Sequence, residues 1–299
     1  MITEIVKVGD WEIKVGESWK VPEKTIKDLE EFLSDKWKMA VMRSVKYPWW
    51  SISNRKMPSP IVRVDLSPLV VGFSVKDCIY EVEVRPAGLG ITTLLLVDQR
   101  SRWSEALSDC GGIIKCPDSS IQDDFICADL LSIPYSNDIL SVNGKGPYWI
   151  RSDKFHFEDS SLVPIRDDGN KQYLVDLKMA QIAVAKNLDW EVPFVIKPLQ
   201  GARCREVEVF LPSKMRKECN GFSTQTRVLK TLARSDEPFI VQSFIPPKKE
   251  IINGESGWVM WRIFFGWIDG YYQCVGGLWF WRPNLKIHGA SDSICGPLR

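Results

Sequence analysis

The pattern of apolar and polar residues predicts strands and helices along the first hundred residues. Polar and apolar residues alternate over 10–16, which indicates an edge strand, and helical periodicity follows over 22–43, with Pro22 near its start. The segment at 47–60 is rich in Pro, Ser and Trp and predicts a connecting loop. The next elements are expected to be strands at 61–66, 69–75 and 78–85 and an apolar helix around 91–98, after a Pro-Ala-Gly-Leu-Gly break at 86–90.

Short apolar pieces in the middle of the chain favour a small α/β insert. The pieces at 112–116 and 125–128 alternate with helical or turn segments within residues 101–150. A well-patterned helix is then expected over 170–187. Further on, the pattern predicts strands at 193–198, 206–211 and 238–245 and a helix near 222–233.

Two long aromatic segments near the end of the chain predict a β-hairpin. They cover 257–268 and 271–282 and are joined across Ile268-Asp-Gly270, where the Asp-Gly pair favours a tight hairpin turn. Together with the helices and strands upstream, this hairpin predicts an α+β protein.

Composition narrows the classes of function. The chain has 299 residues, 44% of them apolar and 26% charged, which is typical of a globular protein with a large core. With 39 Lys and Arg against 38 Asp and Glu, the net charge of +1 argues against nucleic acid as a partner. The chain starts without a continuous apolar stretch and has no run of about 18 apolar residues, so we expect neither a signal peptide nor a membrane helix. These features favour a cytoplasmic location.

Cysteine and histidine offer little catalytic chemistry in this chain. The eight cysteines contain no CxxC pair and no zinc-ligand spacing, so we expect reduced packing residues. His156 and His288 are the only histidines, and no GxSxG sequence accompanies them. A hydrolase triad is therefore disfavoured.

A candidate nucleotide site begins with Lys197. The sequence Phe-Val-Ile-Lys-Pro at 194–198 predicts a buried strand that ends in this lysine, and Gly201 follows in the next loop. A lysine at a strand end reaches phosphate oxygens as a point charge, and a glycine lets backbone N–H groups approach them. A surface lysine beside an ordinary turn is the plain alternative.

Residues further along the sequence than Lys197 are candidates for contacts with the adenine and the phosphates of a nucleotide. Arg262 and Arg282 lie on the two aromatic strands, and a guanidinium suits bidentate contact with phosphates. The predicted strand at 238–245 would act as a hinge between two lobes, and its backbone groups at Gln242, Ser243 and Phe244 would face an adenine edge. The chain thus has, in order, a lysine strand, a glycine loop, a hinge and two arginines. This order is similar to that of the ATP-grasp superfamily.

Acidic residues near the front of the chain form a candidate metal site. Glu81 and Glu83 are two residues apart on one predicted strand, so their side chains share a face at about 6.5–7 Å, and Asp65 lies on the neighbouring strand. Carboxylates that meet a triphosphate suit Mg²⁺, which prefers oxygen ligands in octahedral geometry. The alternative is that the alternating Glu-Val-Glu-Val sequence marks a solvated strand face.

The acidic segment precedes the lysine strand in this sequence, and this order resembles the circularly permuted ATP-grasp fold of the glutathionylspermidine synthetase family. In that family an Arg-x-Asp strand and a Glu-x-Asn strand precede the lysine-proline-glycine segment. The resemblance implies that Arg63 steadies an acyl phosphate and that Asp65 and Glu81 are metal ligands. It further implies phosphate contacts for Lys197 and Arg282, so Arg63 and Arg282 are the candidate catalytic residues.

Two positions depart from the family pattern. Glu83 stands where the family has asparagine, and the loop after Gly201 lacks the second glycine. A second lysine that binds ATP is expected before Lys197, with Lys154 as the first choice and Lys171 as the second.

The expected fold is a circularly permuted α+β ATP-grasp core with a small α/β insert that resembles a pre-ATP-grasp domain. Residues 1–60 form an N-terminal strand–helix segment and residues 61–100 the metal-binding part of the core. Residues 101–165 form the insert, and residues 166–299 form the nucleotide-binding part.

These expectations together predict a ligase that uses ATP and Mg²⁺. It would join the carboxylate of a small molecule or peptide to an amine through an acyl phosphate. A small-molecule kinase and a non-catalytic ATP-grasp-like binding protein are the alternatives. The sequence specifies neither the acid and the amine nor the oligomeric state.

Overall fold

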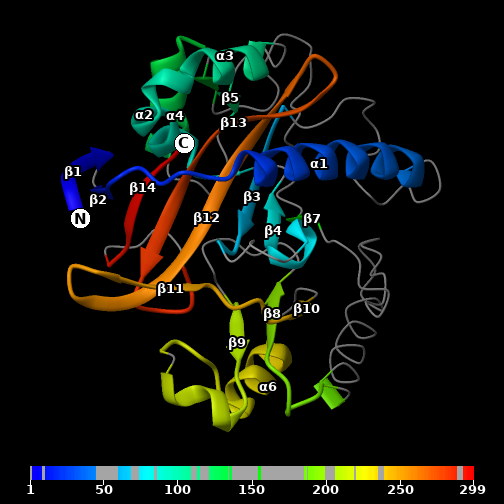
Figure 1. Ribbon diagram of the computed structural model, residues 1–299. Helices are drawn as coiled ribbons and strands as arrows, with labels where there is room; N and C mark the ends of the chain where they lie inside the picture. The colour runs from blue at the N-terminus through cyan, green and yellow to red at the C-terminus, as the bar shows by residue number, and fades with distance from the viewer. Residues whose placement is uncertain are drawn as a thin grey trace.

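The computed structural model is of mixed α+β architecture, which confirms the predicted fold class at that level. Figure 1 shows a large sheet with helices against it and, at one end, a small sheet with its own helix. The residues described are 2–8, 11–44, 60–68, 74–83, 86–108, 113–114, 121–133, 135–136, 154–155, 185–186, 188–198, 206–218, 220–234, 239–287 and 292–299.

Nine described strands form the large sheet, in the order β1-β2-β14-β13-β12-β3-β4-β7 with β11 added on β12. Its centre is the hairpin of β12 (Glu255–Ile268) and β13 (Tyr271–Arg282), and β3 (Ile61–Leu66) pairs antiparallel with β12. The other strands are β1 (Ile2–Val8), β2 (Trp11–Gly16), β4 (Ile79–Glu83), β7 (Lys154–Phe155), β11 (Lys248–Ile252) and β14 (Ile294–Leu298).

The turn of the central hairpin has the geometry that its sequence predicts. Asp269 and Gly270 have φ values of 52° and 87°. Two consecutive positive φ angles are what a type I′ turn requires, and an Asp-Gly pair adopts them at little cost. The predicted hairpin is therefore confirmed: β12 and β13 pair from Trp258 opposite Arg282 to Ile268 opposite Tyr271, with one register shift between Phe264 and Phe265.

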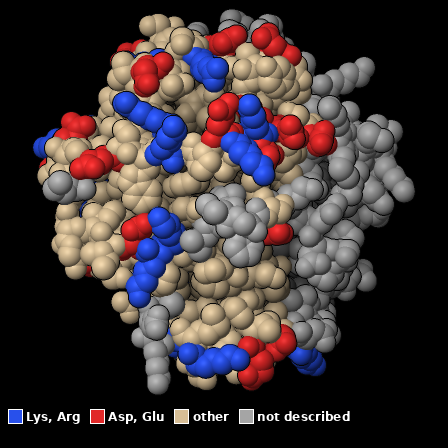
Figure 2. Space-filling view, in the orientation of Figure 1, with Lys and Arg blue, Asp and Glu red and all other residues tan. Residues whose placement is uncertain are grey.

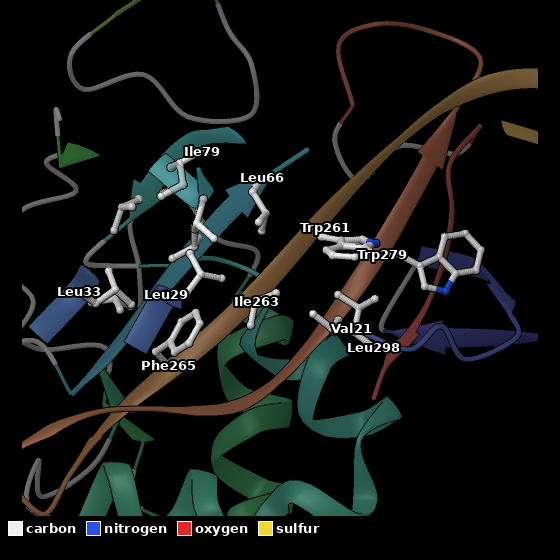
Figure 3. Packing of buried hydrophobic residues seen from close by; sticks show 14 of the residues in the cluster. Val21, Leu29, Leu33, Leu66, Ile79, Trp261, Ile263, Phe265, Trp279 and Leu298 are labelled. Atoms are coloured by element: carbon white, nitrogen blue, oxygen red, sulfur yellow. The ribbon is translucent and has the colours of Figure 1, made fainter. Parts of the chain in front are cut away.

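Helix α1 (Glu23–Ser44) covers one face of the large sheet, as Figure 3 shows from close by. Leu29 and Leu33 of this helix are buried against alternate residues of β3 and β12. Alternation places every second strand residue on this face, so the remaining residues of β3 point to the other side. The sheet residues of this core include Val62, Val64, Leu66, Ile263 and Phe265.

Three helices pack on the opposite face, at the top of Figure 1: α2 (Leu89–Leu95), α3 (Arg100–Ser108) and α4 (Ile121–Leu131). Trp103 of α3 is completely buried and meets the ring of Phe264 on β12 at a centroid distance of 5.2 Å. Ile61 of β3 and Val275 of β13 belong to the same core. The helices therefore cover one end of this sheet face.

The small sheet has the strand order β10-β8-β9 and carries helix α6 (Gln225–Arg234). Its strands are β8 (Phe194–Pro198), β9 (Glu208–Phe210) and β10 (Phe239–Ser243). Val228 and Leu232 of α6 pack on Phe194 and Phe210, whose rings stack at 4.9 Å. This unit lies at the bottom of Figure 1 and has a core of its own.

Several predicted elements differ from the structure. The apolar piece at 125–128 lies inside α4, and Val75 belongs to the 3-10 helix η1 (Val75–Cys78). The expected helix at 91–98 begins earlier, at the start of α2, and gives way to the 3-10 helix η2 (Val97–Gln99). The strand at 10–16 is not at the edge, because β2 lies between β1 and β14.

The small α/β character expected around residues 101–150 is present in the described part of that region. β5 (Ile113–Ile114) and β6 (Tyr135–Ser136) pair in parallel, with α4 between them in the chain. The large sheet takes strands from all four predicted segments, because β7 of the segment 101–165 pairs with β4. How the chain divides into domains stays a prediction.

Some predictions fall outside the described residues. They include the loop expected at 47–60 except for its last residue, positions 69–73 of an expected strand and most of the helix expected at 170–187. Within the described part of the chain, no helix combines the length and the apolar character needed to cross a membrane. On the face shown in Figure 2, described basic and acidic side chains lie next to one another, as the near-zero net charge leads one to expect.

Candidate functional site

Arg63 and Asp65 occupy the face of β3 that α1 does not cover. Val62, Val64 and Leu66 point into the core under α1, so the two polar residues between them share the opposite face. Both are buried, with 4% and 6% of their surface exposed. Buried charges need partners, and the partners of Arg63 and Asp65 define the site.

The Asp65 carboxylate accepts hydrogen bonds from two guanidinium groups. Oδ1 lies 2.9 Å from Nε of Arg63 and 3.0 Å from Nε of Arg262. Oδ2 lies 3.1 Å from Nη2 of Arg63 and 3.0 Å from Nη2 of Arg262. Arg262 comes from β12, where it lies directly opposite Asp65 in the register with β3. Each arginine thus makes a bidentate pair with one carboxylate, the strongest geometry for this kind of ion pair.

Arg262 is held on further sides. Its Cζ lies 4.8 Å from the centroid of the Phe280 ring on β13, within the range of a cation–π contact. Gly88 passes close to its Nη1, because a Cβ placed on Gly88 would lie 3.8 Å from that nitrogen. Only 13% of the Arg262 side chain is exposed. The guanidinium therefore has one defined orientation.

Glu81 and Glu83 extend the polar face onto β4. Glu81 is opposite Asp65 and Glu83 is opposite Arg63 in the antiparallel register. Oε1 of Glu83 lies 2.8 Å from Nη2 of Arg63. Glu81 and Glu83 lie on one side of β4, as predicted, because Val82 between them points into the core on the other side.

The crowding of carboxylates affects the pKa of Glu83. Burial raises the pKa of Glu83 to about 8, and repulsion from the neighbouring carboxylates adds to this effect, although Arg63 opposes it. Burial alone would lower the pKa of Arg63, but the carboxylates outweigh it and raise that pKa above its usual value. Arg63 therefore stays charged, while the environment of Glu83 favours a proton or another cation.

Lys197 enters this site from the small sheet. It is buried at the end of β8, and its Nζ donates to the carbonyl oxygen of Tyr80 at 2.7 Å. The same nitrogen lies 3.8 Å from Oε2 of Glu81. Lys197 and Glu81 are far apart in the sequence, so the packing of the small sheet against β4 creates the contact.

Two other contacts join the small sheet and the following segment to the large sheet. Nε2 of Gln242 on β10 lies 3.4 Å from the carbonyl oxygen of Ile79 on β4. The hydroxyl of Ser67 donates to the carbonyl oxygen of Pro246 at 2.9 Å. The polar groups of the site thus lie where the two sheets meet.

The turn at 86–90 closes one side of the site. Arg63 Nη1 donates to the carbonyl oxygen of Ala87 at 2.9 Å. Asp123 of α4 accepts from the backbone N–H groups of Gly88 at 2.9 Å and Ile91 at 3.0 Å, so it caps the start of α2. Gly90 allows the close approach, because a Cβ there would lie 2.0 Å from the Asp123 carbonyl oxygen.

The acids of the site suit a divalent cation only in part. Within the described residues, no three Asp, Glu, His or Cys side chains are arranged to hold a metal ion. Glu81 and Glu83 fit, because Mg²⁺ is commonly bound by one or two carboxylates together with substrate phosphates. Asp65 does not fit as it stands, since an ionised carboxylate has about four lone-pair sites and the two arginines occupy all of them.

Arg282 lies on the same face of the large sheet as Arg262 but makes different contacts. Its Nε donates to Asp292 at 2.7 Å and its Nη1 to the carbonyl oxygen of Lys286 at 2.8 Å. It is four residues beyond Leu278, the partner of Arg262 in the hairpin register, which corresponds to about 13 Å along the strand. In the described structure Arg282 is therefore not brought together with the arginines at Asp65.

The predicted hinge residues lie on β10 and just after it. Ser243 is exposed and pairs with Phe194 in the small sheet. The Phe244 N–H donates to the carbonyl oxygen of Pro193 at 3.3 Å, so this hydrogen bond continues the pairing of β10 with β8. The adenine contact stays a prediction.

The lysines and the glycine predicted from the loops are harder to place. Lys154 pairs with Glu83 through the β7 backbone, which puts it beside the site, but its side chain lies outside what the structure describes. Gly201 and Lys171 fall outside the described residues as well.

Sequence reasoning missed three supports of the site: Ala87, Asp123 and Phe280. Asp123 acts through backbone groups of a segment 32 to 35 residues earlier, and no local pattern reports such a contact. For Phe280 a signal existed, because it lies two residues from Leu278 on the strand paired with Arg262. The chain matches no protein-family model and no curated protein.

Proposed function

We propose that the chain is an ATP-dependent carboxylate–amine ligase built on a circularly permuted ATP-grasp fold. The observation that carries the proposal is the meeting of Lys197 and Glu81, 3.8 Å apart, from two different sheets. Lys197 ends a strand of the small sheet, as a phosphate-binding lysine of this fold would. Glu81 belongs to the acidic strand of the large sheet. The contact between Lys197 and Glu81, which are far apart in the sequence, supports a single site built from both segments.

The balance of charge at the site supports a polyanionic ligand with a cation. Two arginines and Lys197 supply three positive charges, and the acids of β3 and β4 supply three carboxylates, one of which has a raised pKa. When a triphosphate enters, the cationic side chains provide donors for its oxygens and the Glu81–Glu83 pair provides oxygen ligands for Mg²⁺. Lys154 and Gly201 remain part of this proposal as further ATP contacts.

Each part of the reaction has a group suited to it. ATP would supply the phosphoryl group that activates the substrate carboxylate, and Mg²⁺ would neutralise the triphosphate. Lys197, Arg63 and Arg262 bind and orient the charged oxygens, and no side-chain nucleophile is needed. Such orientation contributes about 7–11 kcal/mol to a reaction of two bound groups. The amine would then displace phosphate from the acyl phosphate.

The first test is binding of Mg-ATP by calorimetry to the parent protein and to Lys197→Met. A charge-assisted hydrogen bond contributes about 1.5–3 kcal/mol, so the variant should bind about 10- to 150-fold more weakly. Lys230→Met, at an exposed lysine of α6, is the matched control and should bind as the parent does. Equal binding by both variants would contradict the role of Lys197.

The second test identifies the reaction. The protein is incubated with Mg-ATP and a panel of acids and amines, and ADP and the products are measured. ADP with an amide product supports the ligase. ADP with a phosphorylated alcohol would identify a kinase instead, and a parent protein that fails to bind Mg-ATP would leave a non-catalytic protein.

A further inference from the structure

Asp65 has no remaining acceptor capacity for a metal ion in this structure. Each of its oxygens accepts one hydrogen bond from Arg63 and one from Arg262, at 2.9–3.1 Å. The carboxylate is 6% exposed, so water is not the main competitor for these bonds. A metal ion at Asp65 would have to displace at least one guanidinium from a buried ion pair, which is costly when the arginine is left without its partner.

The two arginines differ in the donors they keep. Arg63 also donates to Glu83 and to the Ala87 carbonyl, so most of its five N–H groups are used. Arg262 uses Nε and Nη2 toward Asp65, and within the described structure Nη1 has no hydrogen-bond partner. Nη1 lies beside Gly88, where the Cβ of any other residue would lie 3.8 Å from this nitrogen. Arg262 therefore presents two N–H donors in a fixed direction.

We propose that Asp65 is a positioning residue rather than a metal ligand, and that it aims the Nη1 edge of Arg262 at an anionic phosphate oxygen of the substrate. The inference rests on the proposed function for the identity of that anion. The Phe280 ring fixes the plane of the guanidinium, Asp65 fixes its rotation within that plane, and Arg63 fixes Asp65 in turn. Any metal ion is left to Glu81 and Glu83.

Anion binding in the absence of a metal distinguishes a positioning role of Asp65 from a role as a metal ligand. Binding of tripolyphosphate and of ATP is measured by calorimetry in the presence of EDTA, for the parent, Asp65→Asn and Glu81→Gln. Mg²⁺ is then titrated at fixed ATP to obtain its half-saturation. Asp65→Asn removes two of the four acceptor sites and should weaken metal-free binding about 10-fold or more while leaving the Mg²⁺ half-saturation unchanged. Glu81→Gln should show the opposite, a shift in Mg²⁺ half-saturation with little change in metal-free binding.

Several results would overturn the positioning role. One is an Asp65→Asn protein that binds tripolyphosphate like the parent but needs about 10-fold more Mg²⁺, as Glu81→Gln does. Another is a parent protein that binds Mg-ATP but neither anion in EDTA. A parent that binds tripolyphosphate in an Asp65-dependent manner, but not Mg-ATP, would instead support the positioning role and refute the ligase.

A second variant keeps the test decisive if Asp65→Asn fails to fold, which circular dichroism would show. Arg262→Lys retains the positive charge but loses the bidentate geometry and the Nη1 edge. It should weaken tripolyphosphate binding in EDTA about 10-fold, with an unchanged Mg²⁺ half-saturation. Unchanged tripolyphosphate binding in this variant would contradict the proposal on its own.

Discussion

Glu208 joins β9 to α6, and its replacement by glutamine gives a test of how the small sheet is stabilised. The side chain is 5% exposed and has four partners. It accepts hydrogen bonds from the Ser223 hydroxyl, from Arg227 Nε at 3.0 Å and from the Thr231 hydroxyl at 3.0 Å, and Lys286 Nζ lies 3.3 Å away. One buried carboxylate thus connects a strand, a helix and the segment after β13.

The expected loss of stability in Glu208→Gln depends on which interactions the glutamine side chain keeps. Ser223 and Thr231 donate to different oxygens of Glu208, so the single acceptor oxygen of glutamine keeps one of these two bonds. The substitution also removes the charge that partners Lys286, while most of the Arg227 side chain is in solvent and contributes little. Loss of a charge-assisted hydrogen bond at a buried site should lower the free energy of unfolding by about 1.5–3 kcal/mol at pH 7. The measurement is urea unfolding followed by circular dichroism, with hydrogen exchange of residues 206–234 as the local readout.

The stability that Glu208 contributes should depend on pH in a direction set by its pKa. Burial alone would raise the pKa of Glu208, but the hydrogen bonds and Lys286 outweigh it and lower the pKa below its ordinary value. A carboxyl group whose folded pKa is depressed stabilises the protein above its unfolded pKa of about 4.3 and loses that contribution as the pH falls through the folded pKa. The difference between parent and Glu208→Gln should therefore be full at pH 6–7 and shrink below about pH 4.

Glu31→Gln, at an exposed position of α1, is the matched control and should change the free energy of unfolding by less than about 0.5 kcal/mol. Equal stability of the two glutamine variants at pH 7 would contradict this role of Glu208. A deficit of Glu208→Gln that grows as the pH is lowered would contradict it as well.

Two further predictions concern the helices beside the site. Trp103→Ala empties a completely buried position between α3 and Phe264 and should lower the free energy of unfolding by about 3–5 kcal/mol, as measured by urea unfolding; a loss below about 1 kcal/mol would contradict the packing described. Gly90→Ala places a Cβ 2.0 Å from the Asp123 carbonyl oxygen and should separate α2 from α4 at a cost of about 1–3 kcal/mol. Faster hydrogen exchange of the Ile91 amide would report that separation, and unchanged exchange would refute it.

The sequence was informative where a pattern is local. Alternation along the strand now seen as β4 placed Glu81 and Glu83 on one face, and the Asp-Gly pair predicted the central hairpin. The helix at 125–128 was missed because four apolar residues do not distinguish a buried strand from part of a helix.

Pairs that form across strands were beyond such reasoning. Arg262 and Asp65 are separated by 197 residues, and only the register between β12 and β3 brings them together. The strand β1 was also missed, because its interleaved charges resemble an ordinary polar surface until β2 pairs with it. The saturation of Asp65 by two arginines could not be predicted, since it depends on which strands become neighbours.

The way the site compensates its charges explains why it can exist before any ligand binds. Buried arginines without partners would be costly, so the protein places a carboxylate between two of them and holds both guanidinium groups in place. In the role proposed for Arg262, an anion would find donors already oriented, and no reorganisation of the side chain would be needed. Asp65 therefore has two roles. Its hydrogen bonds compensate the charges of two buried arginines, and the same hydrogen bonds fix the orientation of the guanidinium groups. A metal ion at Asp65 would displace at least one of these guanidinium groups, which is why we propose the acids on β4, and not Asp65, as the ligands of a cation.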